Sequence, residues 1–334
     1  METDEEPARI LAGLAASQPR ISHVYMYDDR GSELYEQITR TEEYYPTHTE
    51  LKLLQQHAGS IATFPPTELE PGSETQTLCE LGAGDGHKTL VLLTAMAAKA
   101  PEIVYAPIDV SKGALDANVA AFDREQFEGG GVVRVHPFCG MYESCLPEAR
   151  ALPGRKSFMW LGSSLGNYSD AEGIDLLSLV REQMSERDRF LLGVDTPHGP
   201  TKPAEVIHRA YNDAAGITAA FTLNALRHVN QIAGLDFDWE HGWRHVAEYD
   251  EEQEAIVTHV EAVTPQVLSR GEGAAKQQLH SYAAGQRIFV EQSRKFSLAA
   301  VQRLAKASGL AVARHWTAKD EWHIVAELVL VGCG

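Results

Sequence analysis

The sequence predicts an α/β fold: a doubly wound, Rossmann-like parallel sheet that ends in an antiparallel hairpin, with a smaller α+β domain attached. Five short apolar runs between residues 77 and 194 alternate with stretches of helical spacing, which is typical of βαβ units in a parallel sheet. The alternation stops after Asp195 and resumes near residue 294, so the segment between them has the character of an insertion. Two further apolar runs, at 311–316 and 324–331, predict the terminal hairpin.

The remaining elements follow in chain order. A helix at 47–57 precedes the sheet. The strands of the sheet are predicted at 77–81, 104–108, 132–137, 157–161 and 190–194. Helices are predicted at 87–100, 112–122 and 170–183, where apolar residues recur at helical spacing. The segment after Asp195 predicts mostly helix at 205–229, a strand or hairpin at 246–264, a strand at 287–292 and a helix at 297–308.

This order predicts two domains. A core is expected from residues 61–195 and 294–334, and a cap from residues 1–60 and 196–293. Residues 1–20 are polar and alanine-rich, so we expect a frayed start. The proline-containing stretch 64–76 predicts a connector.

Composition narrows the classes of function. The 334 residues include 29 Lys and Arg against 47 Asp and Glu, and the net charge of −18 disfavours nucleic acid and anionic membranes, because both need clustered cations. No apolar stretch reaches the roughly 18 residues of a membrane span, and the acidic N-terminus lacks the layout of a signal peptide. The four cysteines, Cys79, Cys139, Cys145 and Cys333, form no CxxC pair. We therefore expect a soluble cytoplasmic protein with reduced thiols.

The most specific local motif is a glycine-rich turn, Glu80-Leu-Gly82-Ala-Gly84-Asp-Gly86, between a predicted strand and a predicted helix. Glycines there let the backbone turn tightly and approach a ligand closely. The pattern fits dinucleotide and S-adenosylmethionine (SAM) sites alike. Two details favour SAM: Glu80 is placed to pair with the cationic amino-acid part of the cofactor, and the spacing is G-x-G-x-G rather than G-x-G-x-x-G.

Asp109 ends the second predicted strand and is the candidate for binding the ribose hydroxyls of the cofactor, as acidic residues do in other doubly wound folds. The alternative is a turn or helix-capping aspartate. A P-loop is excluded, because no G-x-x-x-x-G-K-[ST] occurs, although Lys88 and Thr89 follow the glycines.

Other stretches form an ordered pattern with the glycine motif. They are Tyr27-Asp-Asp-Arg-Gly-Ser-Glu-Leu-Tyr35, Ile38-Thr-Arg-Thr-Glu-Glu-Tyr-Tyr-Pro46, Pro107-Ile-Asp-Val110, Leu161-Gly-Ser-Ser-Leu-Gly-Asn167, Ala210-Tyr-Asn-Asp213, Phe221-Thr-Leu-Asn224 and Glu291-Gln-Ser293 before Lys295-Phe296. Together they resemble the histidine-specific SAM-dependent methyltransferases. That family includes enzymes that trimethylate the histidine α-amine to hercynine in ergothioneine biosynthesis, the methyltransferase domain of ovothiol synthases, and fungal enzymes acting on prenylated tryptophan.

The resemblance implies a class I methyltransferase core that binds SAM and a cap that binds substrate. It assigns the amino acid's α-carboxylate to Asn167 and Tyr211, the imidazole to Glu291 and Ser293, and the surroundings of the substrate amine to Tyr27 and Tyr45. Tyr45 and Asn167 are the predicted catalytic residues. The predicted cofactor-binding residues are Glu80, Gly82, Gly84, Lys88, Asp109, Met141 and Tyr142.

Five of the six substrate assignments have a structural alternative. Asn167 follows Gly166 and can be a turn residue, and Tyr211 can be a core aromatic of a helix. Tyr27 and Tyr45 can belong to an aromatic cluster that pins the N-terminal segment. Glu291 can pair at the surface with a neighbouring cation, for which the sequence offers Arg287, Arg294 and Lys295.

The chain departs from the family pattern in three places. Hercynine-forming enzymes usually carry a Gly-Ser-Gly-Thr-like cofactor loop, whereas this loop resembles the ovothiol type at least as much. Many relatives have Gly-Asp-Phe where this chain has Gly140-Met141-Tyr142, so adenine would be held by packing and backbone groups. Thr258 stands where many relatives have a methionine that lines the substrate pocket.

The sequence thus predicts a SAM-dependent N-methyltransferase that acts on histidine or a histidine derivative, with the α-amine as the expected acceptor and trimethylation as the outcome. The alternatives are ring-nitrogen methylation of 5-thiohistidine in ovothiol biosynthesis, a non-catalytic binding protein of the same fold, and an NAD-dependent oxidoreductase. Expected partners are a small amino-acid substrate and a separate sulfoxide synthase of the same pathway, with the protein itself a monomer. His241 and His245 have i, i+4 spacing but no HExxH pattern, so no metal site is expected.

Overall fold

The computed structural model describes residues 5–64, 75–84, 86–122, 131–271, 273–318 and 320–332. Most of the expected connector at 64–76 and also Cys333 lie outside these ranges. The chain divides into two compact units. The first unit is formed by Met1–Tyr44 with Pro203–Ser293, and the second by Tyr45–Lys202 with Arg294–Gly334.

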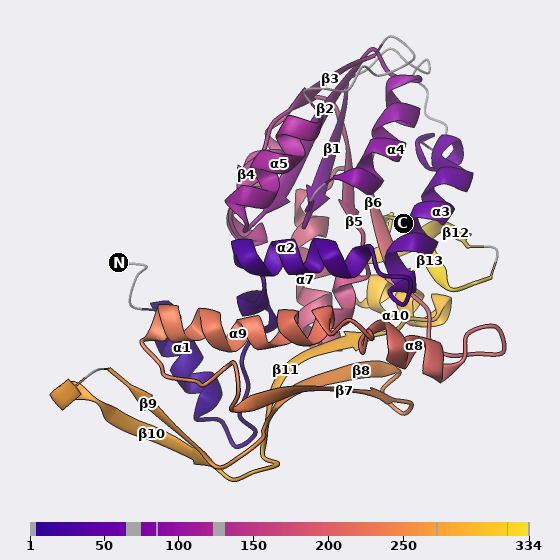
Figure 1. Ribbon diagram of the computed structural model, residues 1–334. Coiled ribbons are helices and arrows are strands. Elements are labelled where there is room, and N and C mark those ends of the chain that lie inside the picture. Colours follow the sequence, from indigo (N-terminus) through magenta and orange to yellow (C-terminus); the bar gives the residue numbers. More distant parts are fainter. Residues whose placement is uncertain are drawn as a thin grey trace. The chain divides into compact units, whose positions relative to one another are not determined.

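A twisted sheet forms the centre of the second unit (Figure 1). Its strands are β1 (Gln76–Leu81), β2 (Glu102–Asp109), β3 (Val132–Val135), β4 (Phe138–Cys139), β5 (Arg155–Trp160), β6 (Arg189–Asp195), β12 (Leu310–Thr317) and β13 (His323–Leu330). They lie in the order β12-β13-β6-β5-β1-β2-β3, and β4 also pairs with β2. β1 to β6 pair in parallel, whereas β13 runs antiparallel to both β6 and β12. The predicted doubly wound sheet with a terminal hairpin is therefore confirmed.

Helices cover both faces of this sheet because its strands are apolar on both faces. The helices are α3 (Tyr45–Ile61), α4 (His87–Ala97), α5 (Lys112–Phe122), α6 (Tyr142–Arg150), α7 (Asp170–Gln183) and α10 (Leu298–Ala307). Along β5, Phe158 and Trp160 face the cluster that contains residues of α6, α7 and α10. Met159 between them faces the cluster that contains residues of α3 and α4, as the two-residue period of a strand requires.

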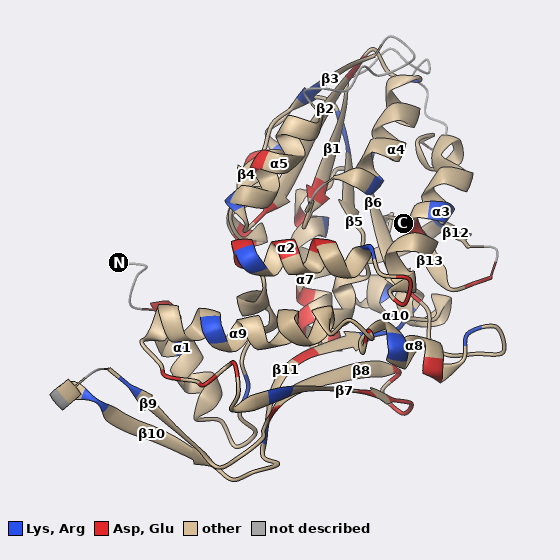
Figure 2. Cartoon of the chain, viewed as in Figure 1, with Lys and Arg blue, Asp and Glu red and all other residues tan. Residues whose placement is uncertain are grey.

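The first unit combines helices with small antiparallel sheets, as predicted for the α+β domain. Its helices are α1 (Glu5–Leu14), α2 (Asp29–Thr39), α8 (Ala204–Ala210) and α9 (Ile217–Ala233), with short 3₁₀ turns η2 (His23–Met26) and η4 (Gly273–Ala275). Its strands are β7 (Trp243–Asp250), β8 (Ala255–Ala262), β9 (Gln266–Arg270), β10 (Gln277–Tyr282) and β11 (Arg287–Arg294). They form one sheet in the order β11-β8-β7 and a separate β9–β10 hairpin. Acidic residues gather in the turn between β7 and β8, at Glu251, Glu252 and Glu254 (Figure 2).

Two expectations about the domain boundaries and the N-terminus differ from the structure. Residues 45–60 were expected in the cap, but α3 belongs to the second unit, because Leu53 and Leu54 are fully buried in the core cluster that α4 also lines. Residues 196–202 likewise fall in the second unit. The expected frayed start is wrong from Glu5 onward: α1 buries Ile10 and Leu14.

The stretch 205–229, predicted to be mostly helix, forms the two helices α8 and α9. Gly216 adopts a left-handed φ of 73° before α9, and the Asp213 carboxylate accepts hydrogen bonds from the backbone amides of Ile217 and Thr218, both at 2.8 Å. This capping satisfies the first amides of α9 and separates it from α8. None of the helices in the described part of the chain is long and apolar enough to cross a membrane.

Candidate functional site

β1 lies where the order of the parallel strands reverses, since it pairs with β2 on one side and with β5 on the other. Because all three strands are parallel, the loops after them leave the sheet at the same edge. In open α/β sheets ligands bind at this point. The glycine motif follows β1, Asp109 ends β2, and the turn that leads to Asn167 follows β5.

The glycine turn needs its glycines for backbone conformation and for space. Gly82, Gly84 and Gly86 all have positive φ angles, of 64°, 52° and 70°. A Cβ on Gly86 would lie 2.6 Å from the Phe122 ring, whereas a Cβ on Gly84 would meet no atom of the described residues beyond its chain neighbours within 4 Å. There is therefore room beside Gly84 for a ligand, while its amide and carbonyl oxygen bond to Asp109 and Asn118. Asp85 between them lies outside the described residues.

Asp109 lies beside the glycine turn and is held there by backbone hydrogen bonds. One of its carboxylate oxygens accepts the Gly84 amide at 3.1 Å, and the other accepts the Ser111 amide at 2.9 Å. The bond to the Ser111 amide, two residues on, is that of a turn aspartate, so Asp109 has this structural role as well. The helix-capping alternative applies to Ser111 instead, whose hydroxyl accepts the Ala114 amide at the start of α5. Burial raises the pKa of Asp109. A carboxylate has about four acceptor positions, so acceptor positions remain for ribose hydroxyls.

Glu80 is buried beneath the turn with two hydroxyl partners. The Thr89 hydroxyl donates to one oxygen at 2.6 Å, and the Tyr105 hydroxyl donates to the other. Burial raises the pKa of Glu80 to about 7. The structure thus gives Glu80 a part in holding α4 and β2 against the motif, and its pairing with the cofactor stays a prediction.

Lys88 forms an ion pair with Glu50, a residue that the sequence reasoning missed. Glu50 has no exposed surface; it accepts the Gly162 amide at 2.9 Å and faces the His323 ring nitrogen at 2.9 Å. Burial alone would raise the pKa of Glu50, but Lys88 and His323 hold it well below its usual value. A signal existed in the sequence, since Glu50 lies three and four residues before Leu53 and Leu54 on the buried face of α3.

Met141 and Tyr142 follow β4 at the same edge of the sheet. Met141 is 52% exposed. The Tyr142 hydroxyl lies 3.1 Å from the position that a Cβ on Gly82 would occupy, so Tyr142 closes on the glycine turn. Burial raises the pKa of Tyr142. The structure therefore brings Gly82, Gly84, Asp109 and Tyr142 together.

Asn167 ends the 3₁₀ turn η3 (Ser164–Asn167) after β5. Gly166 before it must be glycine, because a Cβ there would lie 2.7 Å from the Arg294 carbonyl oxygen. The Asn167 side chain is half-buried, and no residue that the structure describes forms a hydrogen bond with it. Its amide is available to a ligand, unlike that of a turn-forming asparagine.

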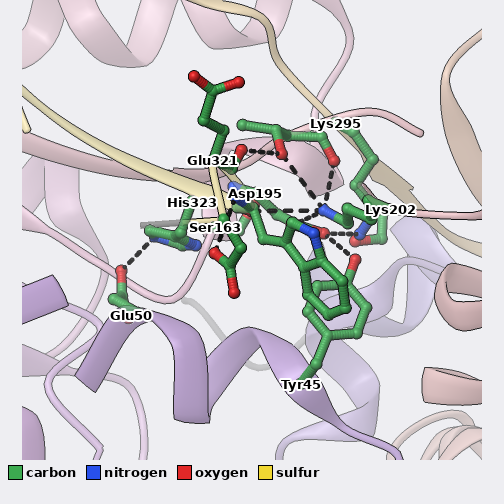
Figure 3. Close-up of polar contacts among 12 residues, drawn as sticks. Tyr45, Glu50, Ser163, Asp195, Lys202, Lys295, Glu321 and His323 are labelled. Atoms are coloured by element: carbon green, nitrogen blue, oxygen red, sulfur yellow. Dashed lines mark hydrogen bonds and ion pairs between the residues drawn. The ribbon is translucent and has the colours of Figure 1, made fainter. Parts of the chain in front are cut away.

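Tyr45 occupies a buried cluster of charges in the second unit. Its hydroxyl donates to Asp195 at 2.6 Å, and its ring packs edge-on against Trp322 at 5.3 Å between centroids. Lys202 and Lys295 pair with the same carboxylate (Figure 3). Sequence reasoning placed Tyr45 near the substrate amine and did not single out Asp195 or the two lysines as site residues.

The other substrate candidates lie in the first unit. The Tyr211 and Ser293 hydroxyls are hydrogen-bonded at 2.6 Å. The Tyr44 ring, which the sequence reasoning did not select, packs edge-on against Tyr211 at 5.9 Å between centroids. Tyr211 therefore belongs to an aromatic cluster and also presents its hydroxyl to a polar neighbour.

Tyr27 lies where the motif stretch that begins at Tyr27 contacts the motif stretch that begins at Phe221. Its ring packs against Phe221 at 5.1 Å between centroids, and the adjacent Asp28 accepts from the Asn224 amide at 2.6 Å. Gly31 is required here, because a Cβ would lie 1.6 Å from the Met26 carbonyl oxygen. The aromatic-cluster alternative thus describes Tyr27 well.

Glu291 is half-buried on β11. The three cations that were its alternative partners each pair with another carboxylate: Arg287 with Glu248 and Glu261, Arg294 with Asp170, and Lys295 with Asp195. Residues i and i+2 of a strand face the same side, so Glu291 and Ser293 share a face of β11.

The two spaced histidines have separate surroundings. His241 is exposed beside Asp238, whereas His245 is held between the Thr222 hydroxyl and the Tyr211 carbonyl oxygen, both at 3.0 Å. Burial lowers the pKa of His245. Within the described ranges, no group of three or more His, Cys, Asp or Glu is arranged to hold a metal ion.

The residues at the edge of the second unit fit SAM. The room beside Gly84, the spare acceptor positions of Asp109 and the exposed apolar side chain of Met141 suit an amino-acid tail, a ribose and an adenine ring. The sequence profile of the family described as "Histidine-specific methyltransferase, SAM-dependent" matches residues 6–329. The chain belongs to this family. It is a SAM-dependent methyltransferase.

Individual relatives agree with this assignment. The chain is 34% identical over 310 residues to the histidine N-alpha-methyltransferase of Mycolicibacterium smegmatis, covering 92% of this chain and 89% of that protein. It is 31% identical over 307 residues to ergothioneine biosynthesis protein 1 of Neurospora crassa, covering 90% of this chain but 32% of that longer protein. It is 26% identical over 317 residues to N-methyltransferase imqF of Aspergillus flavus, covering 93% of this chain and 81% of that protein.

Substitution of Asp109 tests the cofactor site of this methyltransferase. Asp109→Asn replaces one acceptor oxygen by an NH₂ group that cannot accept from the Gly84 or Ser111 amide. We expect S-adenosylhomocysteine (SAH) to bind about 10–100-fold more weakly, as for the loss of a charge-assisted hydrogen bond. Calorimetric titration measures this, with Asp116→Asn on exposed α5 surface as the control. Unchanged SAH affinity in folded Asp109→Asn would contradict the assignment.

Glu80 gives a pH-dependent prediction. Its pKa is raised from 4.5 to about 7, so between these pH values the folded state keeps a proton that the unfolded state has lost, and stability falls as pH rises. Gln does not titrate. The free energy of unfolding of the wild type relative to Glu80→Gln should therefore fall from pH 4.5 to 7 in urea titrations. A difference that is independent of pH would show that burial does not raise this pKa.

Proposed function

We propose that this methyltransferase transfers methyl groups from SAM to the α-amine of histidine and continues to Nα,Nα,Nα-trimethylhistidine (hercynine). The observation that carries the proposal is the relation to the Mycolicibacterium smegmatis histidine N-alpha-methyltransferase, because the identity extends over 92% of this chain and hence over both units. The relative named ergothioneine biosynthesis protein 1 supports a role in ergothioneine biosynthesis.

The chemistry asks little of acid–base groups. When bound, SAM supplies a methyl group on a sulfonium, which is a strong donor. Each transfer would form an N–CH₃ bond as the S–CH₃ bond of SAM breaks, leaving SAH, and the amine would first give up one proton to water or a nearby side chain so that its lone pair is available. The protein therefore has mainly to align a neutral nitrogen with the methyl carbon at about 3 Å and to exclude misaligned poses.

The cofactor is assigned to residues of the second unit. The turn at Gly82 and Gly84 would hold the amino-acid tail, with Glu80 and Lys88 beneath it, and Asp109 would accept the ribose hydroxyls. Met141 and Tyr142 would pack against adenine. The hydrogen bond from Gly84 to Asp109 supports this division, because it fixes the carboxylate beside the room at Gly84.

The amino acid is assigned to the side chains that the family resemblance indicates. Asn167 and Tyr211 would hold the α-carboxylate, Glu291 and Ser293 the imidazole, and Tyr27 and Tyr45 would lie near the amine. Imidazole presents one N–H donor and one acceptor nitrogen, which a carboxylate and a hydroxyl complement. The hydrogen bond between Tyr211 and Ser293 supports the assignment of both residues to one substrate molecule, because it holds their hydroxyls side by side.

We further propose that the protein acts in the cytoplasm as a monomer, with a separate sulfoxide synthase acting on its product. Reduced thiols support the compartment: among the described residues Cys79, Cys139 and Cys145 are free cysteines.

An assay with methyl-labelled SAM tests the proposed reaction. Histidine, 5-thiohistidine and tryptophan are offered side by side, and fragmentation mass spectrometry locates the added methyl groups. We expect histidine to be consumed fastest and to carry three methyl groups on the α-nitrogen. Labelling of a ring nitrogen, or preferential turnover of 5-thiohistidine or tryptophan, would overturn the proposal.

A further inference from the structure

The chain passes between the two units at three places: Tyr44–Tyr45, Lys202–Pro203 and Ser293–Arg294. At each crossing, one of the first two residues that belong to the second unit has a side chain that contacts Asp195. The contacts come from Tyr45, Lys202 and Lys295. The buried Asp195 carboxylate thus contacts a residue beside each of the three crossings.

Figure 3 shows the contacts around Asp195, and the three charged side chains that make them are buried. The Tyr45 hydroxyl donates to Oδ2 at 2.6 Å, the Lys295 ammonium lies 3.0 Å from the same oxygen, and the Lys202 ammonium pairs with Oδ1. None of the three charged side chains is more than 2% exposed. Asp195 is the shared counter-charge of both lysines, so its loss would leave two buried cations uncompensated, whereas loss of Lys202 would leave the Lys295 pair and release the Lys202–Pro203 crossing from Oδ1.

Backbone contacts extend the same arrangement. The Asp195 amide donates to the Ser163 hydroxyl at 2.9 Å, and its carbonyl oxygen accepts the Phe296 amide at 2.8 Å. Lys202 also donates to the carbonyl oxygens of Thr196 and Trp322. The end of β6 therefore fixes the segments on the second-unit side of the crossings from both its side chain and its backbone.

In the first unit, the residues next to two of the crossings are linked to the substrate candidates. Tyr44 packs on the Tyr211 ring, and Ser293 is hydrogen-bonded to the Tyr211 hydroxyl. Tyr44 is covalently joined to Tyr45, and Ser293 is separated from Lys295 only by Arg294. Covalent bonds therefore connect the Asp195 cluster to the residues assigned to histidine.

We propose that Asp195 is a positioning residue for methyl transfer: it fixes the three chain crossings together and so sets the placement of Tyr211 and Ser293 for histidine. The effect on histidine rests on the proposed function, whereas the joint fixing of the crossings does not. Asp195 itself contacts neither ligand in this role; it acts through Tyr45, Lys202 and Lys295.

Lys202→Met tests the proposal, with Lys202→Arg as the conservative variant. Hydrogen exchange is followed by mass spectrometry in peptides covering residues 44–50, 196–203 and 293–297. We expect exchange to quicken by about tenfold in all three peptides of Lys202→Met, since they open as one unit. Exchange that quickens only in 196–203 would overturn the proposal, and this readout stands whatever the substrate is.

Kinetics then separate positioning from general destabilisation. For Lys202→Met we expect the KM for histidine to rise about tenfold, with the SAH dissociation constant within about twofold of wild type, and Lys202→Arg to recover part of the loss. Equal losses for both ligands, or none, would overturn the role in substrate placement. Failure of the wild type to methylate histidine would instead refute the proposed function and leave the exchange result standing.

Arg189→Met is the matched control. Like Lys202, Arg189 is almost fully buried. It lies on β6, at the opposite end from Asp195, and pairs with Glu327 at 3.0 Å. Its loss should lower the melting temperature while leaving exchange in 44–50 and 293–297 unchanged; quickened exchange there would overturn the proposal. If Lys202→Met does not fold, Tyr45→Phe, which removes one hydroxyl, is judged by the same three-peptide exchange criterion.

Discussion

The pairing of β1 with β2 on one side and with β5 on the other is the constraint on which the rest of the core depends. Because these strands are parallel, the loops after them leave the sheet at one edge. Buried or partly buried hydrogen bonds then fix these loops: the Gly84 amide to Asp109, the Gly162 amide to Glu50, and the Asp195 amide to Ser163. The predicted cofactor residues meet there as a consequence of strand order.

Much of this fold could be predicted because the core strands and helices carry strong local signals. Helices α5 and α7 begin and end at the predicted residues, since apolar spacing and flanking turn residues mark both ends. The helix α1 was missed because residues 1–20 are polar and alanine-rich with little apolar periodicity, and α1 packs against α9 from a distant part of the chain. The apolar face of α3 predicted a helix but could not tell which unit it packs on.

The candidate site divides in the same way. The glycine turn and Asp109 are readable because they are close in sequence and end predicted strands. Glu50 and Asp195 were missed, since their partners His323 and Tyr45 are 273 and 150 residues away along the chain. The net charge of −18 also gave no hint that one of these carboxylates lies between two lysines. Such networks form only in the tertiary structure. Their one signal in the sequence is a charged residue among apolar ones, as Glu50 is in α3 and Asp195 is in β6.

In the proposed reaction, SAM and histidine are bound by separate sets of residues, and Glu291 belongs only to the set for histidine. Calorimetric titration of Glu291→Ala with SAH, and with histidine in the presence of SAH, tests this most directly, with Glu291→Gln as the matched variant. We expect histidine to bind at least about tenfold more weakly to Glu291→Ala, with SAH affinity within about twofold of wild type and a smaller loss in Glu291→Gln. Equal losses for both ligands, or unchanged histidine affinity, would contradict it.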